Sequence, residues 1–437
     1  MLRAFMSAFK TPDLRNKLLF TLAMMILYRL GSSVPTPNTQ THNINSCIST
    51  VNNGSNANVY ALINLFSGGA LLHLSAFALG ILPYITASII IQLLVVVIPR
   101  FDQLKKEGQA GQQKLTQYSR YLTIGLAILQ STGFIALARS GQLFQGCTET
   151  VLYKTDVFTL STMVLCMTAG TGIIMWMGEL ITDRGVGNGM SILMFTSISA
   201  RIPNEGNLIL TRGGGFQFVL ILILGLAIMA AVVFVEQAQR RIPVQYAKRM
   251  IGRRQYGGTS TYLPLKVNQA GVIPVIFASS LLYIPQLISQ LMGNSASSFQ
   301  RFVNKYLINQ GSWVNISIYF ALIIFFTYFY VGITFNPEER ADDMKKYGGF
   351  IPGIRPGRPT AEYLQFVLSR ITLPGSLYLG IVAVIPNFFL SYTGGSGSSQ
   401  SFPFGGTAVL IMVGVALDTV KQIESQLMQR NYEGFLH

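Results

Sequence analysis

The stretch YALINLFSGGALLHLSAFALGILPYITASIIIQLLVVVI, residues 60–98, decides the fold of this chain. Its 39 residues are mostly apolar and carry no formal charge. It is nearly twice as long as the ~20 residues that a membrane-spanning helix needs. Helix-breaking residues interrupt it at two places, and they are Gly68, Gly69, Gly80 and Pro83.

These breaks predict a short apolar helix over residues 61–72, followed by a full span over residues 75–98. A half-helix folded beside a span is tolerated only where protein or a water-filled cavity surrounds it. We therefore expect a cavity within the membrane, with a small apolar element at its outer mouth. The alternative is one kinked, lipid-facing span with an apolar lead-in.

Composition indicates a polytopic membrane protein with small loops. Of the 437 residues, 50% are hydrophobic and only 11% are charged, whereas a soluble domain carries about 25% charged residues. Residues 1–17 are amphipathic and run straight into an apolar segment, which argues against a signal peptide. The three cysteines are too few for a metal cluster or a disulfide framework.

Apolar runs predict an all-α chain of ten spans, at 18–34, 75–98, 118–138, 157–181, 189–201, 216–237, 269–292, 315–335, 367–390 and 404–422. The fifth run is short, but charge supports it. With a cytosolic N-terminus, 24 of the 32 Lys and Arg residues fall in inside segments and four in outside loops. Since positive charge favours the cytosolic side, we expect ten spans and two cytosolic termini.

Five plus five spans indicate an inverted repeat of residues 1–201 and 202–437. The second span of each half is broken, at Gly80 and Pro83 in one and at Gly271 and Pro274 in the other. Paired breaks of this kind point to a site at the repeat interface. The alternative is that glycine and proline are common in membrane helices.

Two cytosolic loops, residues 238–268 and 336–366, are unusual in charge. The first carries seven basic residues and no acid, and the second is charge-balanced and stiffened by the prolines of GIRPGRP. Basic pairs with tyrosines between them suit RNA phosphates and bases. The alternative is that the bases only hold the loop inside or touch anionic lipid.

The sequence shows no catalytic constellation, so we expect neither an enzyme, a cofactor nor a metal site. The acids near the spans lie at cytosolic helix ends, and they are Glu179, Asp183, Glu236, Asp418 and Glu424. An ion-coupled transporter usually keeps an acid near mid-membrane. What could line a path is apolar: Ile81, Ile85, Met190, Met194, Ile276 and Ile411. Ordinary packing is the alternative for these six.

Seven segments together resemble the SecY family, the central subunit of the bacterial protein-conducting channel. They are INLFSGGAL (63–71), ALGILPYITASIIIQLL (78–94), GELITDRGVGNGMS (178–191), RRIPVQYAKRMIGRRQYGG (240–258), LPLKVNQAGVIPVIFASS (263–280), FNPEERADDMKKYGGFIPGIRPGRPTAEY (335–363) and GVALDTVKQIESQLMQRNYEGFL (414–436). The likeness runs essentially from end to end. The detailed amino-acid sequence, including an Asn-rich insert before residue 61, is similar to that of actinobacterial members of the family.

The resemblance implies a clamshell of two five-span halves around an hourglass pore. It implies a plug over residues 61–72, with Leu65, Phe66, Gly68, Gly69 and Leu71. It implies a pore ring of Ile81, Ile85, Met194, Ile276 and Ile411, although the family often has isoleucine where Met194 stands. It also implies polar lateral-gate residues, Gln130 and Asn268, and ribosome or motor docking through Arg253, Arg254 and Arg355.

The same resemblance implies an inner-membrane protein that passes unfolded secretory polypeptides and releases transmembrane segments into the bilayer. The implied partners are the small membrane subunits SecE and SecG, the motor ATPase SecA, the ribosome, and signal sequences with their nascent chains. Two other functions remain open from the residues alone. One is a secondary transporter for a small solute, and the other is a membrane scaffold that docks ribosomes.

The cysteines suggest a possible bridge on the outer side. Cys47 and Cys147 fall in the predicted outer loops after spans one and three, whereas Cys166 falls inside span four. Two cysteines on the oxidising face are typical of a structural disulfide. The alternative is a pair of free, solvent-facing thiols.

Overall fold

The structure is a computed structural model. It describes residues 11–51, 69–71, 73–139, 147, 150–246, 249–251, 254–256, 260–291, 306, 312–393 and 406–433. Statements about the fold and the candidate site refer to these residues.

Helices dominate the described chain. In the first half they are α2 (Pro12–Ser33), α3 (Thr41–Val51), α5 (Leu82–Val97), α6 (Pro99–Lys106), α7 (Gln109–Arg139), α8 (Val157–Arg184) and α9 (Gly189–Ser199). In the second half they are α10 (Ile202–Gln237), α11 (Ile273–Leu291), α13 (Trp313–Thr334), α14 (Pro337–Lys346), α15 (Arg358–Thr393) and α16 (Gly406–Glu433). Each of the ten predicted spans therefore contains a helix.

Length and apolar character single out fewer spans than ten. In the described part of the chain, five helical segments could cross a membrane by themselves: Gln109–Arg139, Val157–Arg184, Phe218–Gln237, Trp313–Lys346 and Arg358–Ile385. A sixth is added if α5 and α6, which meet at a bend of 100°, count as one broken span. Helix α9 is apolar but short, as the sequence indicated.

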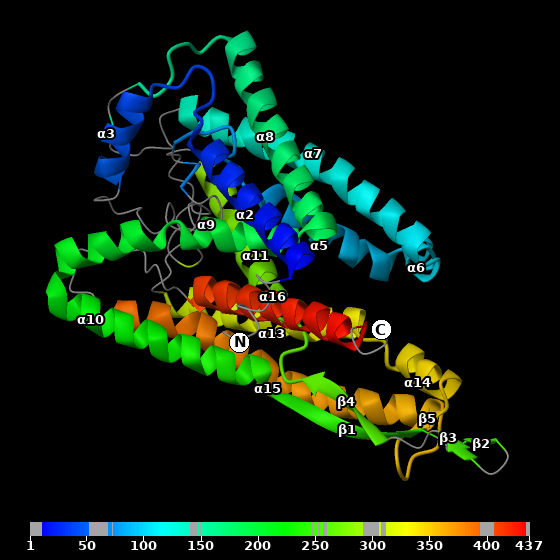
Figure 1. Cartoon of the computed structure of the whole chain (residues 1–437). Helices are drawn as coiled ribbons and strands as arrows, with labels where there is room; N and C mark the ends of the chain where they lie inside the picture. Colours follow the sequence, from blue (N-terminus) through cyan, green and yellow to red (C-terminus); the bar gives the residue numbers. More distant parts are fainter. Residues whose placement is uncertain are drawn as a thin grey trace.

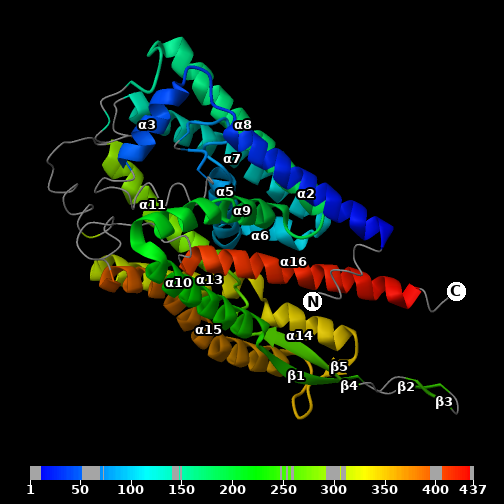
Figure 2. The ribbon, with the colours of Figure 1, turned by 60° about the vertical axis from the view of Figure 1, so that its left-hand side comes forward.

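The helices form two groups with a seam between them (Figure 1). Helices α2, α3, α5, α6, α7 and α8 make the upper group of Figure 1, and α10, α13, α15 and α16 make the lower group. Helices α9 and α11 lie between the groups, and the turned view in Figure 2 agrees. Each group has its own buried apolar cluster, and a third cluster lies where α9 and α16 meet the residues around α5.

The predicted full span over residues 75–98 is only partly helical. Residues 75–81 form turns, and α5 begins at Leu82. Gly80 has a φ of 56°, which ends any helix on its N-terminal side, and Pro83 lies in the first turn of α5. The break that the sequence predicted at these two residues thus marks the start of the helix.

Neighbouring backbone satisfies this irregular segment. The Ala76 amide donates to the Val34 carbonyl at 2.9 Å, and the Leu74 carbonyl accepts from the Thr36 amide at 3.0 Å. Leu74 and Ser75 are fully buried. Non-helical backbone at membrane depth is stable only when protein encloses it in this way.

The expectation of an all-α chain is wrong for two loops, which contain strands. They are the basic loop, residues 238–268, and the charge-balanced loop, residues 336–366. Strand β1 (Gln239–Tyr246) pairs antiparallel with β4 (Ser260–Lys266) on one edge and with β5 (Gly349–Phe350) on the other. A second hairpin pairs β2 (Arg249–Ile251) with β3 (Arg254–Tyr256). In β1, Ile242 and Val244 are buried in alternation with exposed residues, which is the pattern of a strand with one covered face.

The two loops share one small core. Side chains from both sides of the β1–β5 pairing bury each other: Ile242, Leu265, Ile351, Leu364 and Val367. Loops that lie about 100 residues apart in the sequence therefore form a single unit at the end of α15, named the cytosolic unit after its predicted side of the membrane.

Helix α8 approaches the irregular segment closely at Gly170. A methyl group at this position would overlap the carbonyl oxygen of Ala76, whereas a methyl group at Gly172 would meet nothing within 4 Å. We predict that Gly170→Ala lowers the thermal stability of the purified protein by about 1–3 kcal/mol, the usual cost of overpacking. Gly172→Ala is the matched control and should leave the melting temperature unchanged. Equal melting curves for the two variants would contradict the close packing.

A disulfide joins Cys47 of α3 to Cys147, with a Cα–Cα distance of 5.4 Å. Cys47 is fully buried, and its neighbours include Ile44, Leu71 and Leu74. The bridge lies within the upper helix group and closes a sequence separation of 100 residues. It ties α3 to the segment that follows α7 and leaves the seam between the groups uncrossed.

We predict that Cys47→Ser or Cys147→Ser lowers stability by about 3–5 kcal/mol, because the bridge restricts the unfolded chain. Cys166→Ser, at the half-buried free cysteine of α8, serves as the control and should change the melting temperature little. Peptide mapping of unreduced, alkylated protein should recover the linked Cys47–Cys147 peptide. Full labelling of both thiols without reductant would refute the bridge.

Candidate pore and gate

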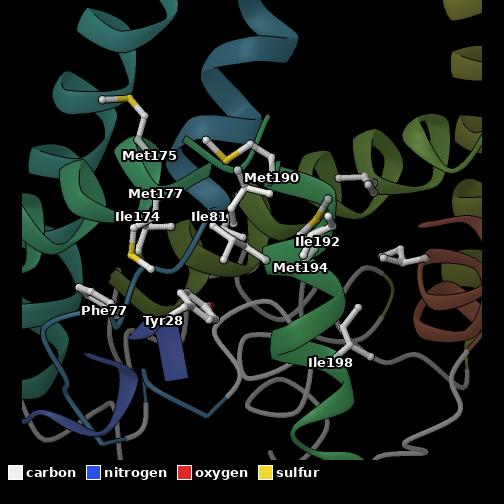
Figure 3. Packing of buried hydrophobic residues seen from close by; sticks show 14 of the residues in the cluster. Tyr28, Phe77, Ile81, Ile174, Met175, Met177, Met190, Ile192, Met194 and Ile198 are labelled. Carbon is white, nitrogen blue, oxygen red and sulfur yellow. The ribbon is translucent and has the colours of Figure 1, made fainter. Parts of the chain in front are cut away.

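All five residues proposed for the pore ring lie in one apolar cluster. Ile81, Met194, Ile276 and Ile411 are buried there, and Ile85 is partly buried against them. They come from four places in the chain: the start of α5, then α9, α11 and α16. Figure 3 shows Ile81 and Met194 within this cluster, beside Met190 and Ile192.

Helix α9 reaches the cluster because it packs tightly on α8. A side chain at Gly189 would overlap the carbonyl oxygen of Gly178, so α9 needs a glycine at this contact. The Asn188 side chain caps α9 by accepting a hydrogen bond from the Met190 amide at 3.1 Å. The GVGNG motif is thus a tight turn and helix cap, and it directs Met190 and Met194 towards the cluster.

The chemistry of this cluster is almost wholly aliphatic and thioether. Among the described hydrophobic residues of this cluster, the polar side-chain groups are the hydroxyls of Tyr28 and Tyr84. Close-packed apolar side chains exclude water, and flexible Met side chains adapt to neighbours of different shape. The arrangement can therefore close a path and deform around a solute, without directional bonds that would select one sequence.

Most of the predicted plug lies outside the described residues. Its predicted members Leu65, Phe66 and Gly68 are among the residues that are not described. Of its C-terminal end, Gly69 has a left-handed φ of 92° and Leu71 is 1% exposed. Leu71 packs in the upper cluster with Ile44 and Cys47, separate from the ring residues. The end of the predicted plug therefore packs beside α3 and its disulfide, a region named the bridged outer cap after its predicted side of the membrane.

Helix α11, which lies between the two groups, contacts α5 and α7 of the upper group. The two predicted gate residues differ in their surroundings. Gln130 of α7 is half-buried, whereas Asn268, before α11, is 3% exposed. One hydrogen bond also joins the two groups: Lys105 Nζ of α6 donates to the carbonyl oxygen of Ile333 in α13 at 3.2 Å.

Asn268 is bonded within its own half of the chain. Its Nδ2 donates to Glu236 Oε1 at 2.5 Å and to the Gly271 carbonyl at 3.1 Å. Sequence reasoning placed Glu236 at a helix end and missed this contact. The sequence does contain a pattern that could have predicted the contact, namely an acidic residue in the last turn of a strongly apolar helix. A carboxylate that is buried there requires a hydrogen-bond donor.

Two of the three predicted docking residues, Arg254 and Arg355, are among the described residues. Arg253 is outside the described residues, and Arg254 is in β3, paired with Ile251. Arg355 is exposed in the turn before α15, and its carbonyl accepts from Thr360 Oγ1 at 2.8 Å. Figure 2 shows the β2–β3 hairpin extending beyond the helices.

The fold and this site define a class: a polytopic helical membrane protein with a buried apolar cluster between two helix groups. Among the described residues, no group of three or more His, Cys, Asp and Glu side chains could hold a metal ion. The family model described as SecY matches residues 75–420 of the chain. The chain therefore belongs to the SecY family.

Curated relatives match the chain over its full length. The protein translocase subunit SecY of Mycobacterium tuberculosis is 64% identical over 441 residues, and that of Streptomyces coelicolor is 62% identical over 442 residues. Both alignments cover 100% of each protein. Both organisms are actinobacteria, which confirms the predicted resemblance to actinobacterial members of the family.

Solved structures share the fold at low sequence identity. A protein-conducting channel superimposes with a TM-score of 0.65 at 18% identity, covering 94% of this chain and 91% of the other. Sec61 of a canine ribosome–channel complex gives a TM-score of 0.60 at 18% identity, with the same coverage. These likenesses show that the helix arrangement is that of the channel fold.

Proposed function

We propose that this chain is the pore-forming subunit of a Sec translocon in the cytoplasmic membrane. It passes unfolded secretory polypeptides across the membrane and releases transmembrane segments sideways into it. The observation that carries the proposal is that Ile81, Ile85, Met194, Ile276 and Ile411, from four separate elements, meet in one apolar cluster. Membership of the SecY family supports the same function.

The ring seals the resting channel and yields to a translocating chain. Aliphatic and thioether side chains make no directional bonds, so any unfolded polypeptide can replace their mutual contacts. The plug, residues 61–72, blocks the outer side of the ring in the resting state. Its end at Leu71 stays in the bridged outer cap, which lets the rest of the plug move while remaining attached.

Sideways release requires that the wall of the pore can open. We assign this opening to the contact of α11 with α5 and α7, with Gln130 and Asn268 as its polar residues. Hydrogen bonds between membrane helices are worth roughly 0.6–2 kcal/mol. An apolar signal sequence of several residues offers more than this through contact with the opened seam and the lipid.

The remaining architecture follows from the same function. Ten spans in two halves, residues 1–201 and 202–437, would open about a hinge, with both termini cytosolic. SecE and SecG would complete the membrane complex. The cytosolic unit with Arg253, Arg254 and Arg355 would receive the ribosome or SecA, which supplies the ATP hydrolysis. Nascent chains with signal sequences are the substrates.

Reconstitution tests the function and the ring together. Vesicles that hold this chain with SecE and SecG should protect a preprotein from protease only when SecA and ATP are added. Ile411→Ser places a hydroxyl in the ring and should raise ion leak through the resting channel several-fold. Leu410→Ser is the matched control, because Leu410 is equally buried but lies in the lower cluster, away from the ring.

The control separates leak from lost packing. Both serine variants should lower the melting temperature, but only Ile411→Ser should raise the conductance of resting vesicles. Equal leak from both variants would exclude Ile411 from the seal. A preprotein that stays fully accessible to protease in the complete system would contradict the proposed function.

Docking is tested by charge reversal. Arg253→Glu with Arg254→Glu should weaken ribosome or SecA binding at least tenfold, and the wild-type affinity for ribosomes should fall as salt rises, because phosphate contacts release counterions. Arg184→Glu is the control, since Arg184 is an exposed base on the same predicted face outside both loops. Ribosome binding that is independent of salt and unchanged by the double reversal would refute this docking surface.

A further inference from the structure

A buried carboxylate lies at the base of the gate helix. Glu236, in the last turn of α10, is 9% exposed, and Asn268, five residues before α11, is 3% exposed. The hydrogen bond of 2.5 Å between them joins the end of α10 to the start of α11. This bond belongs to neither the ring nor the docking unit described above.

The carboxylate determines which way the Asn268 amide faces. An ionised carboxylate only accepts hydrogen bonds, so Nδ2 and not Oδ1 must face Glu236. The second bond of Nδ2, to the Gly271 carbonyl at 3.1 Å, uses its other hydrogen. Both donors of the amide are then occupied. Among the described residues, Asn268 Oδ1 is buried and has no hydrogen-bond partner.

The backbone around Asn268 is held from a second side. A methyl group at Gly375 of α15 would come within 2.5 Å of the Val267 carbonyl oxygen, so α15 packs directly on this segment. Helix α11 continues from here to its contacts with α5 and α7. The base of α11 is thus clamped between α10 and α15, while its body faces the seam.

We propose that Glu236 is a positioning residue of the lateral gate. It fixes the base of α11 through Asn268 and orients the amide so that its oxygen remains an unpaired acceptor. An unsatisfied buried acceptor is unfavourable, so without the bond to Glu236 the amide would turn to give its oxygen a partner. The proposal rests on the proposed function, because it assigns a role in sideways opening.

Loss of Glu236 should make the gate easier to open. Without the carboxylate, the Asn268 amide can turn and α11 is released from α10. Export of a preprotein with a weak signal sequence should rise about threefold to tenfold relative to wild type, the range expected from the loss of one membrane hydrogen bond. A preprotein with a strong signal sequence already opens the gate, so its export should not change.

The experiment uses the full complex with SecA and ATP and compares Glu236→Ala, Glu236→Gln and Asp418→Asn. Glutamine keeps an oxygen that accepts from Asn268 Nδ2, so Glu236→Gln should export both preproteins as wild type does. Asp418 lies near Glu236 and pairs with Lys266 at 3.4 Å but is exposed. Asp418→Asn therefore removes a neighbouring charge without breaking the bond and should have no effect.

A double-mutant cycle with Asn268→Leu isolates the link. If Glu236 acts through Asn268, the effects of Glu236→Ala and Asn268→Leu on the weak-to-strong export ratio should not add. Additive effects, an equal loss of export for both preproteins, or a Glu236→Gln variant that behaves like Glu236→Ala would each overturn the proposal. Failure of the wild-type complex to export either preprotein would instead count against the proposed function.

Discussion

The rest of the structure depends on one constraint: backbone that leaves a helix at membrane depth must find hydrogen-bond partners inside the protein. Residues 75–81 meet this constraint between α2 and α8, where Val34 accepts from Ala76 and Gly170 admits the backbone closely. Phe77 stacks on Tyr28 with ring centroids 6.1 Å apart. A continuous helix would need no such surroundings. The broken lead-in to α5 therefore requires an enclosed site beside it, and the ring cluster occupies that site.

The ring is assembled from elements that are distant in the chain, which explains how it can both seal and yield. Ile81 is placed by the irregular segment, Met194 by the α8–α9 contact, and Ile276 and Ile411 by the lower group. No element supplies the whole proposed ring, so a relative movement of the two groups would enlarge it without unfolding any helix. The bridge between Cys47 and Cys147 stays within the upper group and does not hinder this movement.

Cytosolic and gate features are linked through shared elements. Strand β1 follows directly from α10, which carries Glu236, and β4 leads through Asn268 into α11. The β1–β4 pairing therefore brings the end of α10 and the start of α11 together, and the Glu236–Asn268 bond lies at that junction. A partner that pulls on the cytosolic unit would act on the base of the gate helix.

The sequence by itself determined the class of protein, the position of a helix in each of the ten predicted spans, and the breaks at Gly80 and Pro83. Hydropathy, the distribution of charge and helix-breaking residues are local properties of the sequence. They favour a membrane span or a helix break independently of tertiary contacts. The resemblance to the SecY family also identified the residues of the proposed ring. Composition and spacing alone could not distinguish these residues from ordinary packing residues. Cys47 and Cys147 could be placed on one side of the membrane, but their distance could not be derived from spacing.

Only the tertiary structure decided which of these residues meet. It showed that α5 starts at Leu82, because the stability of residues 75–81 depends on α2 and α8, and it paired the two cysteines. It formed a sheet from loops about 100 residues apart, since β-pairing depends on which strands lie side by side. It also showed that Glu236, which the sequence placed only at a helix end, is buried and accepts a hydrogen bond from Asn268. Burial and pairing depend on neighbours from elsewhere in the chain, and no local pattern specifies those neighbours.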